Sequence, residues 1–79
     1  MKDFTERERD VLVCLLTGLN NIEIAEKLVV TLSTVKAHLT SIYKKLSVRD
    51  RGQAIVECVR LYMEGDEFFE NIFKRNKSQ

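Results

Sequence analysis

Between residues 31 and 46, apolar and polar positions alternate with the period of an α-helix. The apolar residues fall on one stripe, at Val35, Leu39, Ile42 and Leu46. The other side carries hydroxyl groups, lysines and an alanine, and the stretch contains no acidic residue. Apolar residues at spacings of three and four mark the buried face of an amphipathic helix. The pattern therefore predicts a helix over residues 32–45, with Thr31 as its N-cap.

A second helix is predicted near the N-terminus. Thr5 is followed three residues later by Glu8, which is the S/T-x-x-E pattern of a capping box. An apolar series follows, and Gly18 stands where a helix can end in a left-handed residue. We therefore expect a helix over about 5–18.

A short helix is predicted between these two. Asn20 and Asn21 interrupt the chain, and either can cap the residues that follow. The helix is expected over about 21–28, and its apolar face is assigned to Ile22, Ala25 and Leu28. Only about three residues then separate it from the helix over 32–45. Two helices joined by so short a turn form the skeleton of a helix-turn-helix.

The C-terminal part of the chain predicts a fourth helix and a helical tail. Asp50 is the expected N-cap of a helix over about 51–62. Apolar residues cover roughly half of that helix or more, a wider face than an ordinary surface helix shows. The tail has apolar residues at helical spacing, namely Phe68, Phe69, Ile72 and Phe73. It either packs back on the fourth helix or extends a dimer interface.

These elements predict an all-α fold, because no alternating run is long enough for a strand. We expect a compact four-helix domain over residues 1–63 that contains the helix-turn-helix. Residues 64–79 are expected to be a C-terminal extension, partly helical, with a frayed end over 75–79. A chain of 79 residues is marginal alone, so self-association would add stability.

Positive charge is concentrated in the middle of the chain. Residues 31–51 have five basic side chains and one acid, Asp50, a net charge of +4, whereas the whole chain has +1. The five bases are Lys36, Lys44, Lys45, Arg49 and Arg51. A local basic patch of this kind is what contact with phosphate requires.

The composition argues against several other classes of protein. The single histidine and two cysteines, Cys14 and Cys58, do not make a metal site, and no cofactor is predicted. Both cysteines lie in apolar helical patterns, so they are expected to be buried free thiols in a reducing cytoplasm. No nucleophile and base converge, so the chain is not predicted to be an enzyme. No apolar run or signal peptide indicates a membrane.

The stretch from Phe4 to Val56 resembles the LuxR/FixJ/GerE-type helix-turn-helix DNA-binding domain. The matching positions include Thr5-x-Arg7-Glu8, Gly18-x-x-Asn21-x-Glu23-Ile24-Ala25, Thr34-Val35-Lys36-x-His38 and Ile42-x-x-Lys45-Leu46-x-Val48. The resemblance covers about two-thirds of the chain and touches all four predicted helices. The tail beyond about residue 63 lies outside it.

This resemblance implies a bacterial transcription regulator of the cytoplasm and nucleoid. Its third helix would enter the major groove of double-stranded DNA, and its fourth helix would form a homodimer that binds an imperfect inverted repeat. RNA polymerase is a candidate further partner. The chain is similar either to stand-alone, GerE-like members of the family or to an excised effector domain of a response regulator.

The resemblance and the chemistry of α-helices in DNA grooves together assign roles to individual residues. Contacts to bases are expected from Ser33, Lys36, Ala37 and Thr40. Contacts to phosphates are expected from Asn21, Thr31, Thr34, Ser41, Lys44, Lys45 and Arg49. The dimer interface is expected to include Val56, Val59, Arg60 and Met63.

Several of these residues also have a purely structural interpretation. Lys44 and Lys45 would favour the macrodipole at a helix C-terminus without any DNA. Arg51 could pair with Glu8 and brace the first and fourth helices. Leu32 could pack on the turn or contact thymine methyl groups.

Two further features qualify the resemblance. Ser47 stands where the family has a glycine, at a position expected to be left-handed, which could cost up to about 1 kcal/mol. The four-helix arrangement also resembles region 4 of bacterial sigma factors, so a protein-binding helical module is the alternative function. The basic, hydroxyl-rich face of residues 32–45 favours DNA over that alternative.

Overall fold

The computed structural model describes residues 3–77 of the chain, with side chains for residues 3–74. These residues form five helices and no strand, which confirms the all-α prediction. The helices are α1 (Glu6–Leu16), α2 (Asn21–Leu28), α3 (Leu32–Leu46), α4 (Arg51–Met63) and α5 (Glu67–Lys77). The end that we expected to fray is helical as far as Lys77, and residues 78 and 79 lie outside the described residues.

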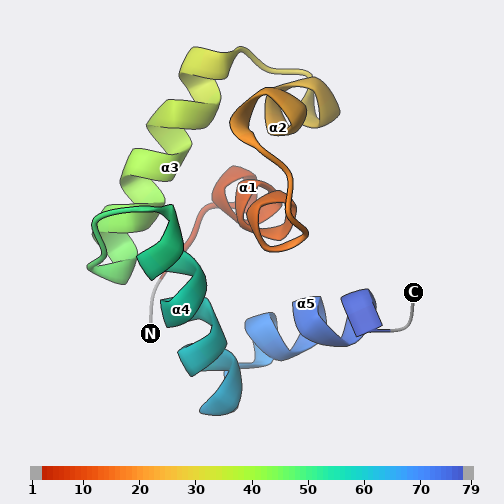
Figure 1. The fold of residues 1–79 in the computed structure, drawn as a ribbon, viewed down its shortest axis with the longest axis vertical. Helices are drawn as coiled ribbons and strands as arrows, with labels where there is room; N and C mark the ends of the chain where they lie inside the picture. The colour runs from red at the N-terminus through yellow and green to blue at the C-terminus, as the bar shows by residue number, and fades with distance from the viewer. Residues whose placement is uncertain (1–2, 78–79) are drawn as a thin grey trace.

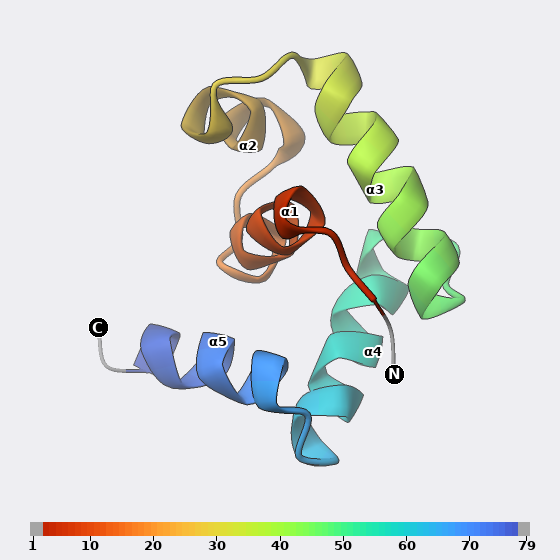
Figure 2. The same cartoon turned by 180° about the vertical axis from the view of Figure 1, so that it is seen from behind.

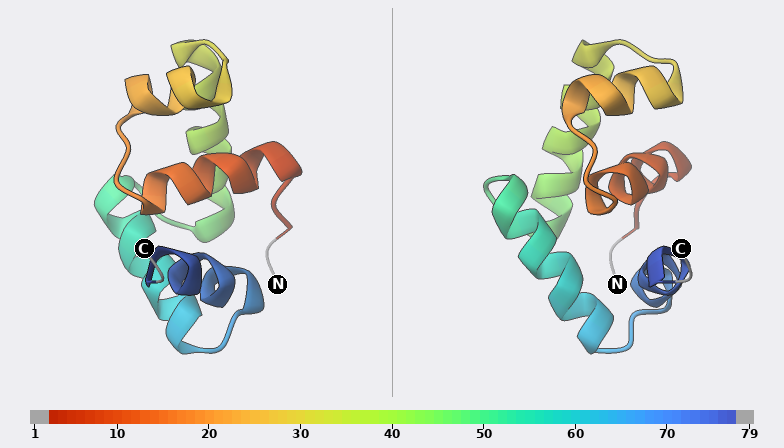
Figure 3. Two further views of the ribbon diagram at one scale, coloured as in Figure 1. Left: turned by 90° about the vertical axis from the view of Figure 1, so that its right-hand side faces the viewer. Right: turned by 45° about the vertical axis from the view of Figure 1, so that its right-hand side comes forward.

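Helix α1 crosses the middle of the molecule, with α2 on one side of it and α5 on the other (Figures 1 and 2). Helices α3 and α4 follow one another along one flank and close the structure there. Helix α3 packs against both α1 and α2, and α5 packs against α4. The turn between α2 and α3 therefore lies at the opposite end of the molecule from α5, as Figure 3 shows.

Side-chain caps fix where the first four helices begin. Thr5 and Glu8 exchange the two hydrogen bonds of the predicted capping box. Asn20, the first of the two asparagines, caps α2 and forms a second capping box with Glu23. Thr31 accepts a hydrogen bond from the backbone N–H of Thr34, and Asp50 caps α4 in the same way. Each cap satisfies a backbone N–H that has no partner within its helix.

Left-handed residues end α2 and α3 and follow α1. Gly18 has the predicted positive φ, at 92°. Ser47 also has a positive φ, at 58°, as its place in the family pattern led us to expect. Val29 was not anticipated: it has φ 57° and ψ 51°, and its side chain is 87% exposed. A β-branched residue is rare in this conformation. The left-handed backbone at Val29 lets the turn between α2 and α3 close within three residues.

The tail is an integral part of the hydrophobic core. Phe69 is 1% exposed and Ile72 is 5% exposed, and both belong to the same buried cluster as the helix-turn-helix. The rings of Tyr62 and Phe73 lie 4.7 Å apart between α4 and α5. The guanidinium of Arg9 lies over the ring of Phe68, 5.5 Å from its centre, which connects α5 to α1. Of the two fates considered for the tail, the structure therefore shows packing on α4.

Candidate nucleic-acid interface

The four residues predicted to contact bases lie exposed along α3. Ser33, Lys36, Ala37 and Thr40 are all exposed, whereas the stripe of α3 led by Val35 is buried against α1 and α2. The helix is thus held by one face and offers the other to solvent. A helix of this kind fits the major groove of B-form DNA, where side chains reach the edges of the bases.

Hydroxyl groups at the start of α3 are ordered by local hydrogen bonds. The Thr31 hydroxyl oxygen accepts from the backbone N–H of Thr34 at 3.1 Å and lies 2.9 Å from the Thr34 hydroxyl. Further along α3, the Thr40 hydroxyl donates to the carbonyl of Lys36 at 3.0 Å. These hydroxyls are therefore oriented before any ligand is bound, and a hydroxyl oxygen has two acceptor lone pairs, so further hydrogen bonds are possible.

Three of the predicted DNA-contacting cations are exposed. Lys36, Lys44 and Arg49 make no side-chain hydrogen bond or ion pair with any side chain described in residues 3–74. They stand on the α3 surface and on the loop that follows it. Their positive charge is therefore available to phosphate groups, because a cation without an ionic partner attracts a phosphate over a longer distance.

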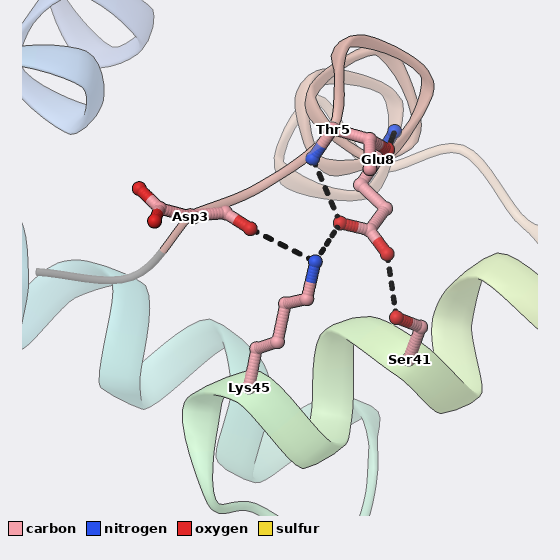
Figure 4. Close-up of polar contacts among 5 residues, drawn as sticks. All are labelled: Asp3, Thr5, Glu8, Ser41 and Lys45. Atoms are coloured by element: carbon pink, nitrogen blue, oxygen red, sulfur yellow. Dashed lines mark hydrogen bonds and ion pairs between the residues drawn. The ribbon is translucent and has the colours of Figure 1, made fainter.

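Ser41 and Lys45 occupy a different environment, around the buried carboxylate of Glu8 (Figure 4). The Lys45 ammonium donates to Glu8 Oε1 at 2.7 Å and to the carbonyl of Asp3 at 2.8 Å. The Ser41 hydroxyl donates to Glu8 Oε2 at 2.5 Å, and the backbone N–H of Thr5 donates to Oε1 at 2.9 Å. The carboxylate thus joins the first turn of α1 to the second half of α3.

The same contacts determine the ionisation of Glu8. Glu8 is only 4% exposed, and burial alone would favour the neutral form of its side chain. The hydrogen bonds from Lys45, Ser41 and Thr5 outweigh burial and lower the pKa of Glu8 from 4.5 to about 2. Glu8 is therefore a charged, fully partnered group at neutral pH.

The suggested pairing of Arg51 with Glu8 is wrong. Arg51 Nη1 donates to the Asn21 side-chain oxygen at 3.1 Å, and Nη2 donates to the carbonyl of Leu19. These bonds fasten the start of α4 to the start of α2, while Lys45 takes the place at Glu8. Asn21 keeps its side-chain NH₂ group as a donor for other ligands.

An open depression lies where α2, α3 and α4 begin. It is lined by Asn20, Asn21, Ile22, Leu32, Lys36 and Arg51. The apolar face assigned to α2 from the sequence includes Ile22, but this residue does not face the core, because it is 61% exposed. Ile24 and Ala25 are the buried residues of that helix. In an eight-residue helix the period alone does not fix which neighbouring apolar residue faces inward.

One face of α4 remains exposed although α5 covers another. Val56 is 69% exposed and Met63 is 78% exposed, and Val59 on the same helix is 37% exposed. Arg60 lies at the edge of this face and forms ion pairs with Glu57 and Glu64. The four residues predicted to form a dimer interface are therefore all accessible on the surface of α4.

The cysteines and acidic side chains of the described residues form no further site. Both cysteines are buried free thiols, as predicted, and burial raises the pKa of both, that of Cys58 to about 12. No group of three or more histidine, cysteine or acidic side chains within residues 3–77 could hold a metal ion. No helix in this part of the chain is long and apolar enough to cross a membrane.

Five helices with a capped, basic and solvent-facing third helix define the chain as a helix-turn-helix domain. The sequence profile of the GerE family, described as bacterial regulatory proteins of the luxR family, matches residues 2–58. This match spans well over half of the chain, so the chain belongs to the LuxR family. It is a DNA-binding domain of the LuxR-family transcriptional regulators.

Curated relatives agree with this assignment. The chain is 59% identical over 58 residues to the transcriptional regulatory protein LnrK of Bacillus subtilis, which covers 73% of this chain and 26% of LnrK. It is 42% identical over 62 residues to LiaR of B. subtilis, covering 78% of this chain and 29% of LiaR. It is 44% identical over 52 residues to the response regulator VraR of Staphylococcus aureus, covering 66% of this chain and 25% of VraR. The chain thus spans about a quarter of the length of these relatives.

Proposed function

We propose that the chain binds double-stranded DNA as a homodimer at an inverted repeat, with α3 in the major groove, and thereby regulates transcription in the cytoplasm. The observation that carries this proposal is the exposed face of α3, where Lys36, Ala37 and Thr40 stand together without acidic neighbours on the helix. RNA polymerase is the natural further partner of such a regulator.

Within this proposal, base contacts come from Ser33, Lys36, Ala37 and Thr40. A lysine can donate to guanine O6 and N7, an alanine can touch a thymine methyl group, and hydroxyls serve either kind of base. Phosphate contacts come from the exposed cations Lys44 and Arg49 and from the polar groups Asn21, Thr31 and Thr34. Phosphate contacts hold the helix in register, while base contacts select the sequence.

We assign a different role to two residues first expected at phosphates. Ser41 and Lys45 both donate to Glu8, whose residue is 4% exposed. Turning Lys45 toward DNA would leave a buried carboxylate without its ionic partner, which is costly. We therefore propose that Ser41 and Lys45 hold α3 at a fixed angle on α1.

The dimer is proposed to form through α4. Val56, Val59 and Met63 present apolar surface that neither α5 nor the core covers, with Arg60 at its edge. Two copies joined in this way would place their recognition helices about 34–36 Å apart, on successive major grooves. That spacing requires a DNA site with two half-sites of opposite direction.

Selection of bound duplexes from a random pool tests the proposal directly. The expected result is one enriched sequence made of two half-sites whose centres are one helical turn apart. The matched control is the Lys36→Ala chain, which should enrich the same repeat with one base position relaxed. Enrichment of single half-sites would overturn the dimer. Failure to enrich any sequence would overturn the proposal and favour the protein-binding alternative.

A further inference from the structure

We propose that Leu32 and Ile22 form an apolar patch that contacts the methyl group of a thymine within two base pairs of the base contacted by Lys36. This inference rests on the proposed function and adds a specificity-determining pair to it. The patch lies in the open depression between the first turns of α2, α3 and α4, which is lined by Ile22, Leu32 and Lys36 among others.

The two apolar side chains are exposed where the fold offers them no cover. Ile22 is 61% exposed and Leu32 is 38% exposed, although they come from different helices. A single exposed apolar residue on a protein surface has no special meaning. Here two of them line one depression with the cation Lys36, so the surface combines apolar contact with positive charge.

The charges around the depression favour a polyanion as its occupant. Lys36 makes no side-chain bond within residues 3–74, and Arg51 adds a second cation at the α4 end. The Glu23 carboxylate on the first turn of α2 is turned back onto the backbone N–H of Asn20, at 2.8 Å. The cations of the lining therefore suit a DNA strand, while Ile22 and Leu32 suit a group without polar atoms.

Thymine supplies the only such group at the major-groove edge of the bases. Its C5 methyl group accepts apolar contact, whereas the other edges present hydrogen-bond donors and acceptors. Leu32 lies one helical turn before Lys36, on the same side of α3. Four residues of helix rise about 6 Å, so the thymine is expected within two base pairs of the base that Lys36 contacts.

Replacing thymine by uracil in the selected duplex tests the inference, because uracil pairs identically and lacks only the methyl group. Each thymine is replaced in turn, and binding is measured with the unaltered chain. One or two replacements within two base pairs of the position relaxed by Lys36→Ala should weaken binding about four-fold, the value of one buried methyl group.

The second arm assigns the effect to the patch. Leu32→Ala should bind thymine and uracil duplexes equally well at that position, and Ile22→Ala should show a reduced difference. Val29→Ala is the matched control, because Val29 is an exposed apolar residue that does not line the depression. It should keep the full sensitivity to uracil.

The outcomes separate this inference from the function on which it rests. Tight, sequence-selective binding that no uracil weakens would overturn the reading of a methyl group and leave the proposed function intact. Equal sensitivity in the unaltered and Leu32→Ala chains would also overturn it. Failure of the unaltered chain to bind any duplex selectively would overturn the proposed function itself.

Discussion

Glu8 in the first turn of α1 and Lys45 in the last turn of α3 form an ion pair, with 2.7 Å between Oε1 and Nζ. One carboxylate thus performs two tasks: it completes the capping box of α1 and anchors the far end of α3. The angle of α3 to the rest of the domain therefore depends on this buried charge as well as on the apolar stripe led by Val35.

Acid should weaken the fold through Glu8. The folded-state pKa of about 2 lies below the ordinary value of 4.5, so the folded protein binds fewer protons than the unfolded chain between these values. Glu8 therefore contributes about 3 kcal/mol that is present above pH 4.5 and lost as the pH falls toward 2. Urea unfolding of Glu8→Gln from pH 7 to pH 2.5 should show lower stability at pH 7 and a weaker dependence on pH.

Glu23→Gln is the matched control for this experiment, because Glu23 makes the same capping box in α2 but is exposed. It should retain most of the acid dependence of the unaltered chain. An unchanged pH profile in Glu8→Gln would contradict the role assigned to this carboxylate.

Neighbouring lysines at the end of α3 should behave differently when removed. Lys44→Ala should weaken binding to all DNA sequences alike and reduce the salt slope by about one, because Lys44 is exposed and contacts phosphate in our proposal. Lys45→Ala should instead lower the free energy of unfolding by about 1–3 kcal/mol, since it leaves Glu8 without its ionic partner. Salt titrations of DNA binding and urea unfolding measure both quantities. A loss of salt slope in Lys45→Ala without a loss of stability would restore Lys45 to the phosphate contacts.

A charge in the exposed face of α4 should separate the proposed dimer. Val56 is 69% exposed in a single chain and would be covered in the proposed dimer, so Val56→Asp would bury a carboxylate in the interface. Sedimentation equilibrium should then give the mass of a monomer, and binding should weaken on a duplex with two half-sites but not on one with a single half-site. Val29→Asp, at another exposed valine, serves as the control for sedimentation. A mass unchanged by Val56→Asp would exclude this face as the interface.

The tail should be required for folding. Phe69→Ala removes a ring that is 1% exposed between α5 and the rest of the core, and substitutions of this kind cost about 3–5 kcal/mol. A domain of this size has little more stability than that to lose. Circular dichroism during thermal unfolding should show a large loss for Phe69→Ala and a small change for Asn71→Ala, an exposed residue of the same helix. Equal melting temperatures would show that α5 contributes little to the core.

Glycine should stabilise the two left-handed positions that have another residue, Val29 and Ser47. Val29 and Ser47 have positive φ without being glycine, which costs about 1–2 kcal/mol per residue, partly offset by the greater freedom of glycine when unfolded. Val29→Gly and Ser47→Gly should each raise the urea midpoint by an amount equivalent to about 0.5–1 kcal/mol, at constant slope. Gly65→Ala is the reverse control: its φ is 90° and a Cβ would meet no atom within 4 Å, so any loss of stability comes from the backbone alone.

The sequence alone predicts most of the helices because their signals are local. The box of Thr5 and Glu8, the caps at Thr31 and Asp50 and the stripe of α3 each lie within a few residues. The partners of Glu8 could not be predicted in this way, because Ser41 and Lys45 are 33 and 37 residues away. Their pairing depends on how α3 crosses α1, which no local pattern contains.

The same limit explains the errors in α2 and in the turn that follows it. Ile22 and Ile24 both suit an amphipathic helix of eight residues, and only the packing against α1 and α3 decides that Ile24 is buried. Val29 has no feature that favours a left-handed backbone, whereas Gly18 does. The depression beside Lys36 was likewise hidden, because it is made by the ends of three helices that are separate in the sequence.

Helix α5 lies on the far side of α1 from the turn between α2 and α3. Its contribution to the core is therefore physically remote from the surface that would choose a DNA sequence. Substitutions in α5 can tune how long the domain survives heat or proteolysis while leaving its choice of binding site unaltered, and substitutions on the open face of α3 can do the reverse. The stability of the domain and the DNA sequence that it selects can therefore change independently during evolution.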